Sequence, residues 1–173
     1  MKIALTGTPG VGKTEVADEL ERKGYKIIRI EEIADEFVAG YDEERESKIV
    51  DEKKMNEYIK KIEEGDDILI IEGHLSHLMD VDGIIILRCH PEELKKRMES
   101  KKWKKKKIRE NLEAEALDII LERALERHEK IWEIDTTLKK LSEVVDEVER
   151  IIKEMPSPFY GKIDYSEWLI ENA

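Results

Sequence analysis

The chain has 173 residues and a formal net charge of −11, a length that suits one domain and an acidic balance that disfavours general attraction to nucleic acid. Its single cysteine, Cys89, excludes both an internal disulfide and a cysteine-based zinc cluster. No apolar run approaches the ~20 residues that cross a bilayer, and no apolar signal-peptide centre follows Met1, so we expect a cytoplasmic protein without membrane contact.

Short apolar runs alternate with longer amphipathic stretches, as in a parallel sheet wound with crossover helices. Strands are expected at Lys2–Thr6, Lys26–Ile30, Ile68–Ile71, Gly83–Arg88 and, with the weakest pattern, Ile134–Thr136. Helices are expected at Lys13–Lys23, Asp51–Glu64, Pro91–Ser100, Ile108–Trp132 and Ser142–Glu154. The pattern predicts a single α/β domain over residues 1–173, with a five-stranded parallel sheet flanked by helices.

A glycine-rich segment lies between the first predicted strand and the first predicted helix. It fits the phosphate-loop pattern G-x-x-x-x-G-K-[ST] of P-loop NTPases with the sequence Gly7-Thr8-Pro9-Gly10-Val11-Gly12-Lys13-Thr14. The backbone amides from Gly10 through Thr14, together with the positive end of the helix dipole, are expected to bind phosphate oxygens. Lys13 is predicted to reach the β and γ phosphates and the Thr14 hydroxyl to bind Mg²⁺, so the segment predicts a site for a magnesium-bound nucleoside triphosphate.

An acidic residue and a histidine follow the third predicted strand. Glu72 comes directly after the apolar run, at the carboxyl end of the sheet where open α/β folds bind ligands. We expect Glu72 to hold a metal-bound water or to orient the attacking group, with His74 facing the same opening. Capping or packing is the alternative role for His74.

Two arginines accompany the fourth predicted strand. Arg88 ends that strand on the ligand side, and Arg97 lies nearly two turns into the helix that follows. Phosphoryl transfer gains most from cations around the transferring group. We therefore predict that Arg88 acts in catalysis and that Arg97 binds the nucleotide.

Residues 101–109 hold seven cations within nine positions of an acidic protein. We predict that this segment is a basic lid that closes over polyphosphate, with Lys101 and Arg109 among its phosphate ligands. A solvated helix face is one alternative. An RNA-binding patch, in which Trp103 stacks on a base, is another.

Two polar segments remain. Residues 31–64 occupy the position where nucleotide kinases place the arm that holds the phosphoryl acceptor, and Arg45 and Lys48 are its best candidates to contact an acceptor phosphate. A solvated acidic surface fits the composition of the arm equally well. The C-terminal tail, residues 156–173, begins with prolines that cannot continue a helix, and we expect it to pack back on the domain.

These residues together resemble a known family, the small adenylate-kinase-like ATPases of archaea and eukaryotes. The family includes the coilin-interacting nuclear ATPase and its yeast relative in small-subunit ribosome maturation. The segments that carry the resemblance are Gly7–Thr14, Tyr41–Glu44, Glu72–His74, Leu87–Arg88 with Pro91 and Leu94, Arg97, the lid run through Asn111, and Ile134–Thr137. The resemblance extends over nearly the whole chain.

The resemblance implies ATP and Mg²⁺ as ligands, reversible phosphoryl transfer between ATP and AMP, and an ATPase activity tied to the Glu72–His74 pair. Thr136 falls in the segment that is similar to the loop near the adenine. The resemblance further implies a partner, the platform ribosomal protein of the small subunit, and a role in ribosome biogenesis and rRNA processing. Contact with pre-ribosomal RNA through the basic lid belongs to the same set of expectations.

The chain departs from the family pattern at two places. Ala34-Asp35-Glu36 stands where many relatives have an acceptor-binding arginine, and Lys101-Lys102 replaces the Arg-Gly that commonly precedes the lid aromatic residue. A lysine keeps the charge but lacks the two-point grip of a guanidinium on phosphate. Two other functions therefore stay open beside the nucleoside monophosphate kinase: an ATP-switched assembly factor and a small-metabolite kinase.

Overall fold

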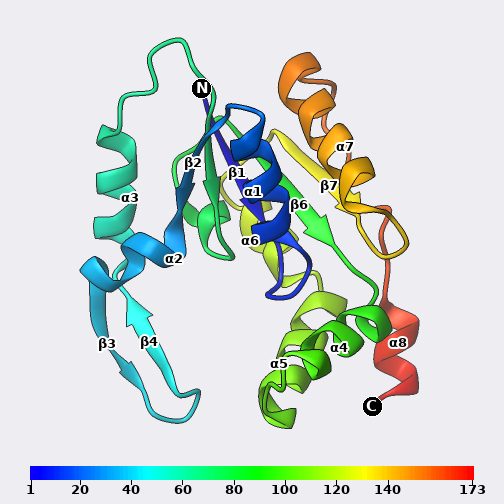
Figure 1. Ribbon diagram of the computed structural model, residues 1–173. Helices are drawn as coiled ribbons and strands as arrows, with labels where there is room; N and C mark the ends of the chain where they lie inside the picture. The colour runs from blue at the N-terminus through cyan, green and yellow to red at the C-terminus, as the bar shows by residue number, and fades with distance from the viewer.

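The computed structural model describes residues 1–173 and centres on a five-stranded parallel sheet in the order β2-β5-β1-β6-β7 (Figure 1). The strands are β1 Lys2–Thr6, β2 Lys26–Arg29, β5 Leu69–Glu72, β6 Gly83–Arg88 and β7 Ile131–Asp135. The chain moves from β1 to one side of the sheet and later returns to the other side, so the carboxyl end of β1 lies at a topological switch point. This is the five-stranded parallel sheet that the sequence predicts.

Helices cover both faces of the sheet because successive strand residues point to opposite sides. Ile3 and Leu5 of β1 join the largest apolar cluster, which includes residues of α1 (Lys13–Arg22) and α7 (Leu141–Glu154). Ala4, between them, packs in a second cluster with Leu121 and Ala124 of α6 (Ile119–Leu125). Figure 1 shows α1 and α7 side by side on one face. None of the helices is both long and apolar enough to span a membrane.

The long helix predicted over Ile108–Trp132 is wrong. The structure divides this stretch into α5 (Lys105–Ala116) and α6, and its last two residues begin β7. Asp118 lies between the two helices with φ +56°, a left-handed conformation that Asp tolerates better than most residues. The apolar spacing continues through the break, so periodicity alone could not locate it.

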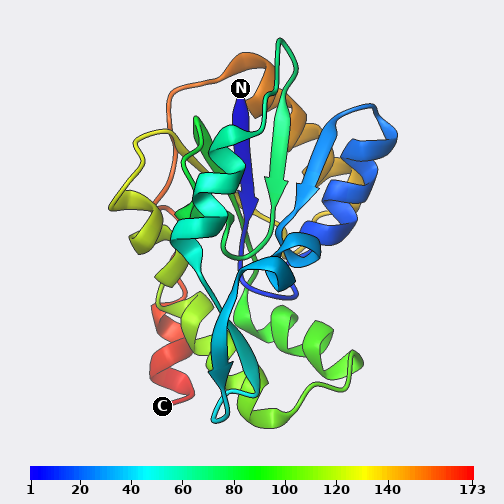
Figure 2. The same cartoon turned by 90° about the vertical axis from the view of Figure 1, so that its left-hand side faces the viewer.

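The predicted acceptor arm contains strands that the sequence pattern did not indicate. After α2 (Ile30–Ile33) and the 3₁₀ segment η1 (Ala34–Phe37), the chain forms an antiparallel hairpin of β3 (Val38–Asp42) and β4 (Ser47–Val50). Helix α3 (Glu52–Lys61) then leads back to the sheet. The hairpin and the pair formed by α4 (Pro91–Ser100) and α5 both lie beyond the carboxyl ends of the strands (Figures 1 and 2).

The C-terminal tail packs against the open edge of the sheet and against α4. Phe159 exchanges backbone hydrogen bonds with Ile131 and Glu133 of β7, at 3.1 and 3.0 Å. The short helix α8 (Ser166–Glu171) then presents Trp168, whose indole Nε1 donates a 2.7 Å hydrogen bond to the Glu92 carboxylate. The tail therefore ties β7 to the helix pair α4 and α5, the second of which includes residues 105–109 of the basic segment.

Gly83→Ala should destabilise the fold by about 1–3 kcal/mol, because the new methyl group overpacks a close contact between β6 and β7. A Cβ atom at Gly83 would lie 2.8 Å from Trp132 Cζ3 and 3.2 Å from Ile3 Cδ1. Gly40→Ala is the matched control, since the nearest side-chain atom to a Cβ there is Ile49 Cδ1, at 3.7 Å. Denaturant unfolding measures both changes, and equal losses would contradict the packing argument.

Candidate functional site

The glycine-rich segment turns from the carboxyl end of β1 directly into the first turn of α1. Gly12 caps α1 with φ +107°, a conformation that a residue with a side chain rarely adopts. The ten-residue helix starts at Lys13, so its unpaired amides and the positive end of its dipole face the ligand side of the sheet. This arrangement fits an anion such as a phosphate group.

Lys13 is a buried cation at this helix start. Its ammonium group donates to the carbonyl oxygens of Gly7 and Thr8 at 2.7 and 3.2 Å, within the same loop. Burial lowers the pKa of Lys13 to about 8, although the carboxylates of Glu72 and Glu115 act in the opposite direction. A phosphate anion that reached the loop would favour the charged form of this lysine.

Glu72 is the last residue of β5, opposite Leu5 of β1 in the sheet register. Burial raises the pKa of Glu72, against the opposing charges of Lys13 and Arg29, and the carboxylate forms no ion pair. Gly73 fixes the turn that follows, because a Cβ there would lie 2.8 Å from Ile30 Cβ. The carboxylate is therefore held at the carboxyl edge of the sheet, next to the start of α1.

His74 lies at the exposed rim of the same edge. Desolvation of the ring by the protein around it lowers the pKa of His74, and the positive charges of Lys13 and Lys107 lower it further. The ring is therefore neutral at neutral pH. A neutral imidazole can donate one hydrogen bond and accept another, which suits the placement of a water molecule or hydroxyl group.

A cleft of about 300 Å³ opens between the phosphate loop, the end of α4 and the loop that follows β7. Arg97 crosses it: its guanidinium donates to the carbonyl oxygens of Val11 at 3.2 Å and Thr136 at 3.5 Å. The Thr136 hydroxyl donates to Arg88 O at 2.9 Å, which fixes the loop after β7 against β6. The cleft is continuous with the anion site at the start of α1, because Gly10 and Gly12 of the phosphate loop line it.

The structure brings most of the predicted nucleotide-binding residues to this cleft. Those that line it are Gly10, Val11, Gly12, Arg97, Lys101 and Thr136, and Lys13 and Thr14 lie at the adjoining start of α1. The sequence did not indicate the other residues that line the cleft, which are Glu15, Val16, Ser100, Lys139, Leu141 and Val144. The position of Lys139–Leu141 directly after the segment that holds Thr136 was the available signal.

Arg109 lies outside the cleft. It is on the exposed side of α5, where its guanidinium pairs with Glu113 one helical turn later, at 2.8 Å. The structure therefore does not bring Arg109 to the cleft where it was predicted to contact the nucleotide. The structure also places Trp103 against the main apolar core rather than free for base stacking.

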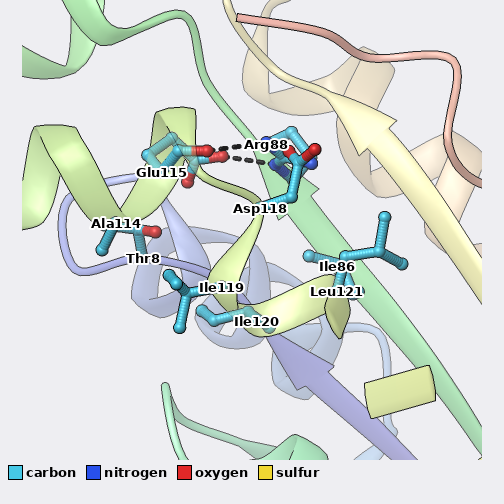
Figure 3. Close-up of a pocket in the computed structure, with 9 residues that line it drawn as sticks. All are labelled: Thr8, Ile86, Arg88, Ala114, Glu115, Asp118, Ile119, Ile120 and Leu121. Atoms are coloured by element: carbon cyan, nitrogen blue, oxygen red, sulfur yellow. Dashed lines mark hydrogen bonds and ion pairs between the residues drawn. The ribbon is translucent and has the colours of Figure 1, made fainter. Parts of the chain in front are cut away.

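Arg88 is buried among carboxylates instead of facing the opening (Figure 3). Its guanidinium donates to the carboxylates of Glu115, Glu133 and Asp118, and to the backbone carbonyl of Glu115 at 2.9 Å. All three guanidinium nitrogens are thus engaged by α5, by β7 and by the residue between α5 and α6. This placement corrects the expectation that Arg88 is a free catalytic cation and makes it a link between the sheet and α5.

Burial and ion pairing act in opposite directions on the charges of this cluster. Burial opposes the charge on Arg88, but Glu115 and Glu133 raise its pKa above the usual value. Burial likewise raises the pKa of Glu115, which the positive charge of Arg88 and a hydrogen bond from Thr8 oppose. Glu133 also accepts a 2.7 Å hydrogen bond from the backbone amide of Gly161. The phosphate loop, α5, β7 and the tail therefore meet at one ionic cluster.

The oxygen atoms next to the phosphate loop fit a magnesium ion. Thr14 is exposed in the first turn of α1, and the Glu72 carboxylate is unpaired at the neighbouring strand end. No group of three or more potential ligands forms a closed metal cage. Mg²⁺ suits such a site, because it is commonly held by one or two protein oxygens together with phosphates and water.

Comparison with known sequences identifies close relatives over nearly the full length. A family model described as an AAA domain matches residues 3–118. A "Putative adenylate kinase" of Methanocaldococcus jannaschii is 41% identical over 170 residues, which cover 96% of this chain and 94% of that protein. A protein with the same name from Archaeoglobus fulgidus is 45% identical over 153 residues, which cover 88% of this chain and 83% of that protein.

Solved structures share the fold at low sequence identity. A gluconokinase from Sinorhizobium meliloti superposes with a TM-score of 0.55 at 14% identity, covering 89% of this chain and 94% of its own. A shikimate kinase from Bacteroides thetaiotaomicron gives a TM-score of 0.51 at 16% identity, covering 88% and 98%. These two similarities support the predicted P-loop fold and carry no information about substrate.

Arg88→Met should cost about 3–5 kcal/mol of stability, because it leaves the buried carboxylates of Glu115 and Glu133 without their cation. The free energy of unfolding from a denaturant titration measures this loss. Arg22→Met is the control, since Arg22 pairs with Glu19 at the exposed surface and should change stability by less than about 0.5 kcal/mol. A loss for Arg88→Met as small as that of the control would show that the cluster is not a structural link.

Proposed function

Because this chain belongs to the adenylate-kinase-like family of P-loop proteins, we propose that it catalyses reversible phosphoryl transfer between ATP and AMP. The observation that carries the proposal is the phosphate loop at the carboxyl end of β1, continuous with a cleft that Arg97 crosses. The relatives bear the name of an adenylate kinase, and the fold is that of compact kinases. Kinase chemistry on a nucleotide is the function that joins these observations.

In the proposed reaction, a phosphate oxygen of AMP forms a bond to the γ-phosphorus of ATP. The bond between that phosphorus and the β–γ bridging oxygen breaks, and both products are ADP. The amides of Gly10–Thr14 and the ammonium group of Lys13 would bind the β and γ phosphates, where negative charge is concentrated. Lys13 must exchange its bonds to the carbonyls of Gly7 and Thr8 for phosphate oxygens when the nucleotide enters.

Magnesium would be held by the Thr14 hydroxyl, with Glu72 binding it directly or through a water molecule. When bound, the ion neutralises phosphate charge and orients the γ phosphate. Burial raises the pKa of Glu72 by more than the charges of Lys13 and Arg29 lower it. A divalent cation at this position would remove that penalty.

We assign the proposed ATPase activity to Glu72 and His74. The neutral ring of His74 lies two residues after the buried carboxylate and can place a water molecule for attack on the γ-phosphorus. Hydrolysis and transfer to AMP would then use the same phosphate loop and differ only in the attacking oxygen. Exclusion of water by a closed lid would favour transfer over hydrolysis.

The acceptor arm favours a second candidate, a kinase for a small metabolite. The two cations predicted to grip an acceptor phosphate are both paired within the arm: Lys48 with Asp35 at 2.5 Å and Arg45 with Asp42 at 3.9 Å. An acceptor without a phosphate group would leave these pairs intact. A screen of AMP, other nucleoside monophosphates and unphosphorylated metabolites as acceptors separates the two candidates.

A role in maturation of the small ribosomal subunit is the finer biological proposal. A formal net charge of −11 and the acidic arm support binding of a basic segment, such as the tail of the platform ribosomal protein. The exposed lysines of residues 101–109 support contact with pre-ribosomal RNA. If the protein is an ATP-switched assembly factor, its affinity for that ribosomal protein must differ between the ATP and ADP states; equal affinities would remove this role.

Lys13→Met should reduce ADP formation from ATP, AMP and Mg²⁺ by about a hundredfold or more, because it removes a cation from the transferring phosphoryl group. A coupled assay for ADP, with ATP alone as the baseline, gives the rate. Lys23→Met is the matched control, since Lys23 lies at the other end of α1 and pairs with Glu149. ADP formation by the unaltered protein that does not exceed the ATP-alone baseline would refute the kinase proposal.

The affinity for ATP should fall as the pH rises through about 8, the pKa of Lys13 in the free protein. Triphosphate charge raises this pKa in the complex, so the complex holds a proton that the free protein loses, and binding weakens by about tenfold per pH unit above it. Calorimetric titration between pH 7 and 9.5 measures the dissociation constant. Lys13→Arg keeps its charge over this range, so the steep dependence should disappear in that variant.

A further inference from the structure

An aromatic ring anchors two lysines in the basic lid, residues 101–109. Trp103 is half-buried and packs against the main apolar core, unlike the exposed lysines on either side. The ammonium groups of Lys101 and Lys107 lie 5.9 and 4.4 Å from the centroid of its ring. Both distances are within the range of a cation–π interaction. One fixed indole therefore orders two otherwise flexible side chains.

These two lysines differ from the other basic residues of the lid in what they face. Lys101 lines the cleft next to the phosphate loop. Lys107 lies over the same indole ring as Lys101. Lys104 instead forms a 2.6 Å ion pair with Glu46 in the hairpin. Lys101 thus belongs to the phosphate side of the lid, and Lys107 is held by the same indole ring.

Neither Lys101 nor Lys107 is paired with a carboxylate, although the protein has 42 acidic residues. Lys101 adds its positive charge next to the loop that holds Lys13, which favours the binding of a multiply charged anion. A free lysine side chain would lose considerable rotational entropy on binding phosphate. Stacking on Trp103 removes part of that cost before the ligand arrives.

We propose that Trp103 is a positioning residue that holds Lys101 and Lys107 ready to bind the phosphate chain of the nucleotide. A guanidinium is planar and rigid, so it loses little freedom when it binds phosphate, whereas a lysine side chain is flexible. The indole ring supplies this missing order to Lys101. The inference rests on the proposed function only in taking the ligand of the loop and cleft to be a polyphosphate. It is independent of the acceptor and of the chemical step.

The test uses inorganic tripolyphosphate with Mg²⁺ as the probe, since this ligand has neither a base nor a reaction to undergo. Trp103→Leu should weaken its binding by about tenfold in calorimetry, the combined effect of two partly exposed cation–π contacts. Trp103→Phe keeps an aromatic face and should stay within about threefold of the unaltered protein. Lys95→Met, an exposed lysine of α4 outside the lid, controls for the loss of one positive charge.

A double-mutant cycle separates positioning from mere support of the fold. In the Lys101→Met/Lys107→Met background, Trp103→Leu should cause no further loss of affinity, because the lysines through which it acts are gone. A loss of the same size in that background would overturn the proposal. So would Trp103→Phe binding as weakly as Trp103→Leu, or Lys95→Met having the effect of Trp103→Leu.

The outcome is separable from that of the proposed function. If ADP forms from ATP and AMP but Trp103→Leu binds tripolyphosphate as well as the unaltered protein does, the inference about Trp103 is wrong and the kinase proposal stands. If no ADP forms from AMP but tripolyphosphate binding depends on Trp103 as described, the inference stands and the acceptor assignment is wrong.

Discussion

The nucleotide site depends on one buried positive charge, the ammonium group of Lys13. Lys13 is buried and has no carboxylate within ion-pairing distance; two loop carbonyls accept its hydrogen bonds, and the more distant charges of Glu72 and Glu115 favour its charged form. Those carbonyls belong to the loop that must wrap a phosphate, which means that the free and bound states compete for the same ammonium group. The loop therefore stores an unsatisfied charge that only an anion at the start of α1 fully relieves.

Three arrangements of cations in this acidic protein illustrate how partners decide the role of a positive charge. Arg88 is saturated by carboxylates and holds α5 and β7 together. Arg97 bonds to backbone carbonyls on both sides of the cleft and also pairs with Glu93 at 3.3 Å, so it shapes the cleft while a carboxylate partly neutralises its charge. Lys101 and Lys107 have only an aromatic ring as partner, and so keep their charge available. From residue type alone, all of these cations would be expected to bind phosphate.

Features encoded by neighbouring residues could be predicted from the sequence, and features that join distant residues could not. The strands around Ile70 and Ile85 and the phosphate loop follow from local apolar runs and from spacing. The fate of Arg88 depends on Glu115 and Glu133, which are 27 and 45 residues away, so its local context suggested a free cation. The helix break at Asp118 depends on one residue in a left-handed conformation, inside an apolar pattern that continues past it. The hairpin depends on the pairing of β3 with β4, which the sequence pattern did not indicate.

The acceptor arm and the lid are electrostatically linked, which bears on how an acceptor phosphate could be bound. Arg45 and Lys48 of the arm pair with its own carboxylates, and its hairpin turn pairs Glu46 with Lys104 of the lid. Positive charge for an acceptor phosphate is then available from the phosphate loop and the lid. On the proposed function, recognition of the acceptor and closure of the lid over ATP are therefore one coupled event, since the same unpaired cations serve both phosphate groups.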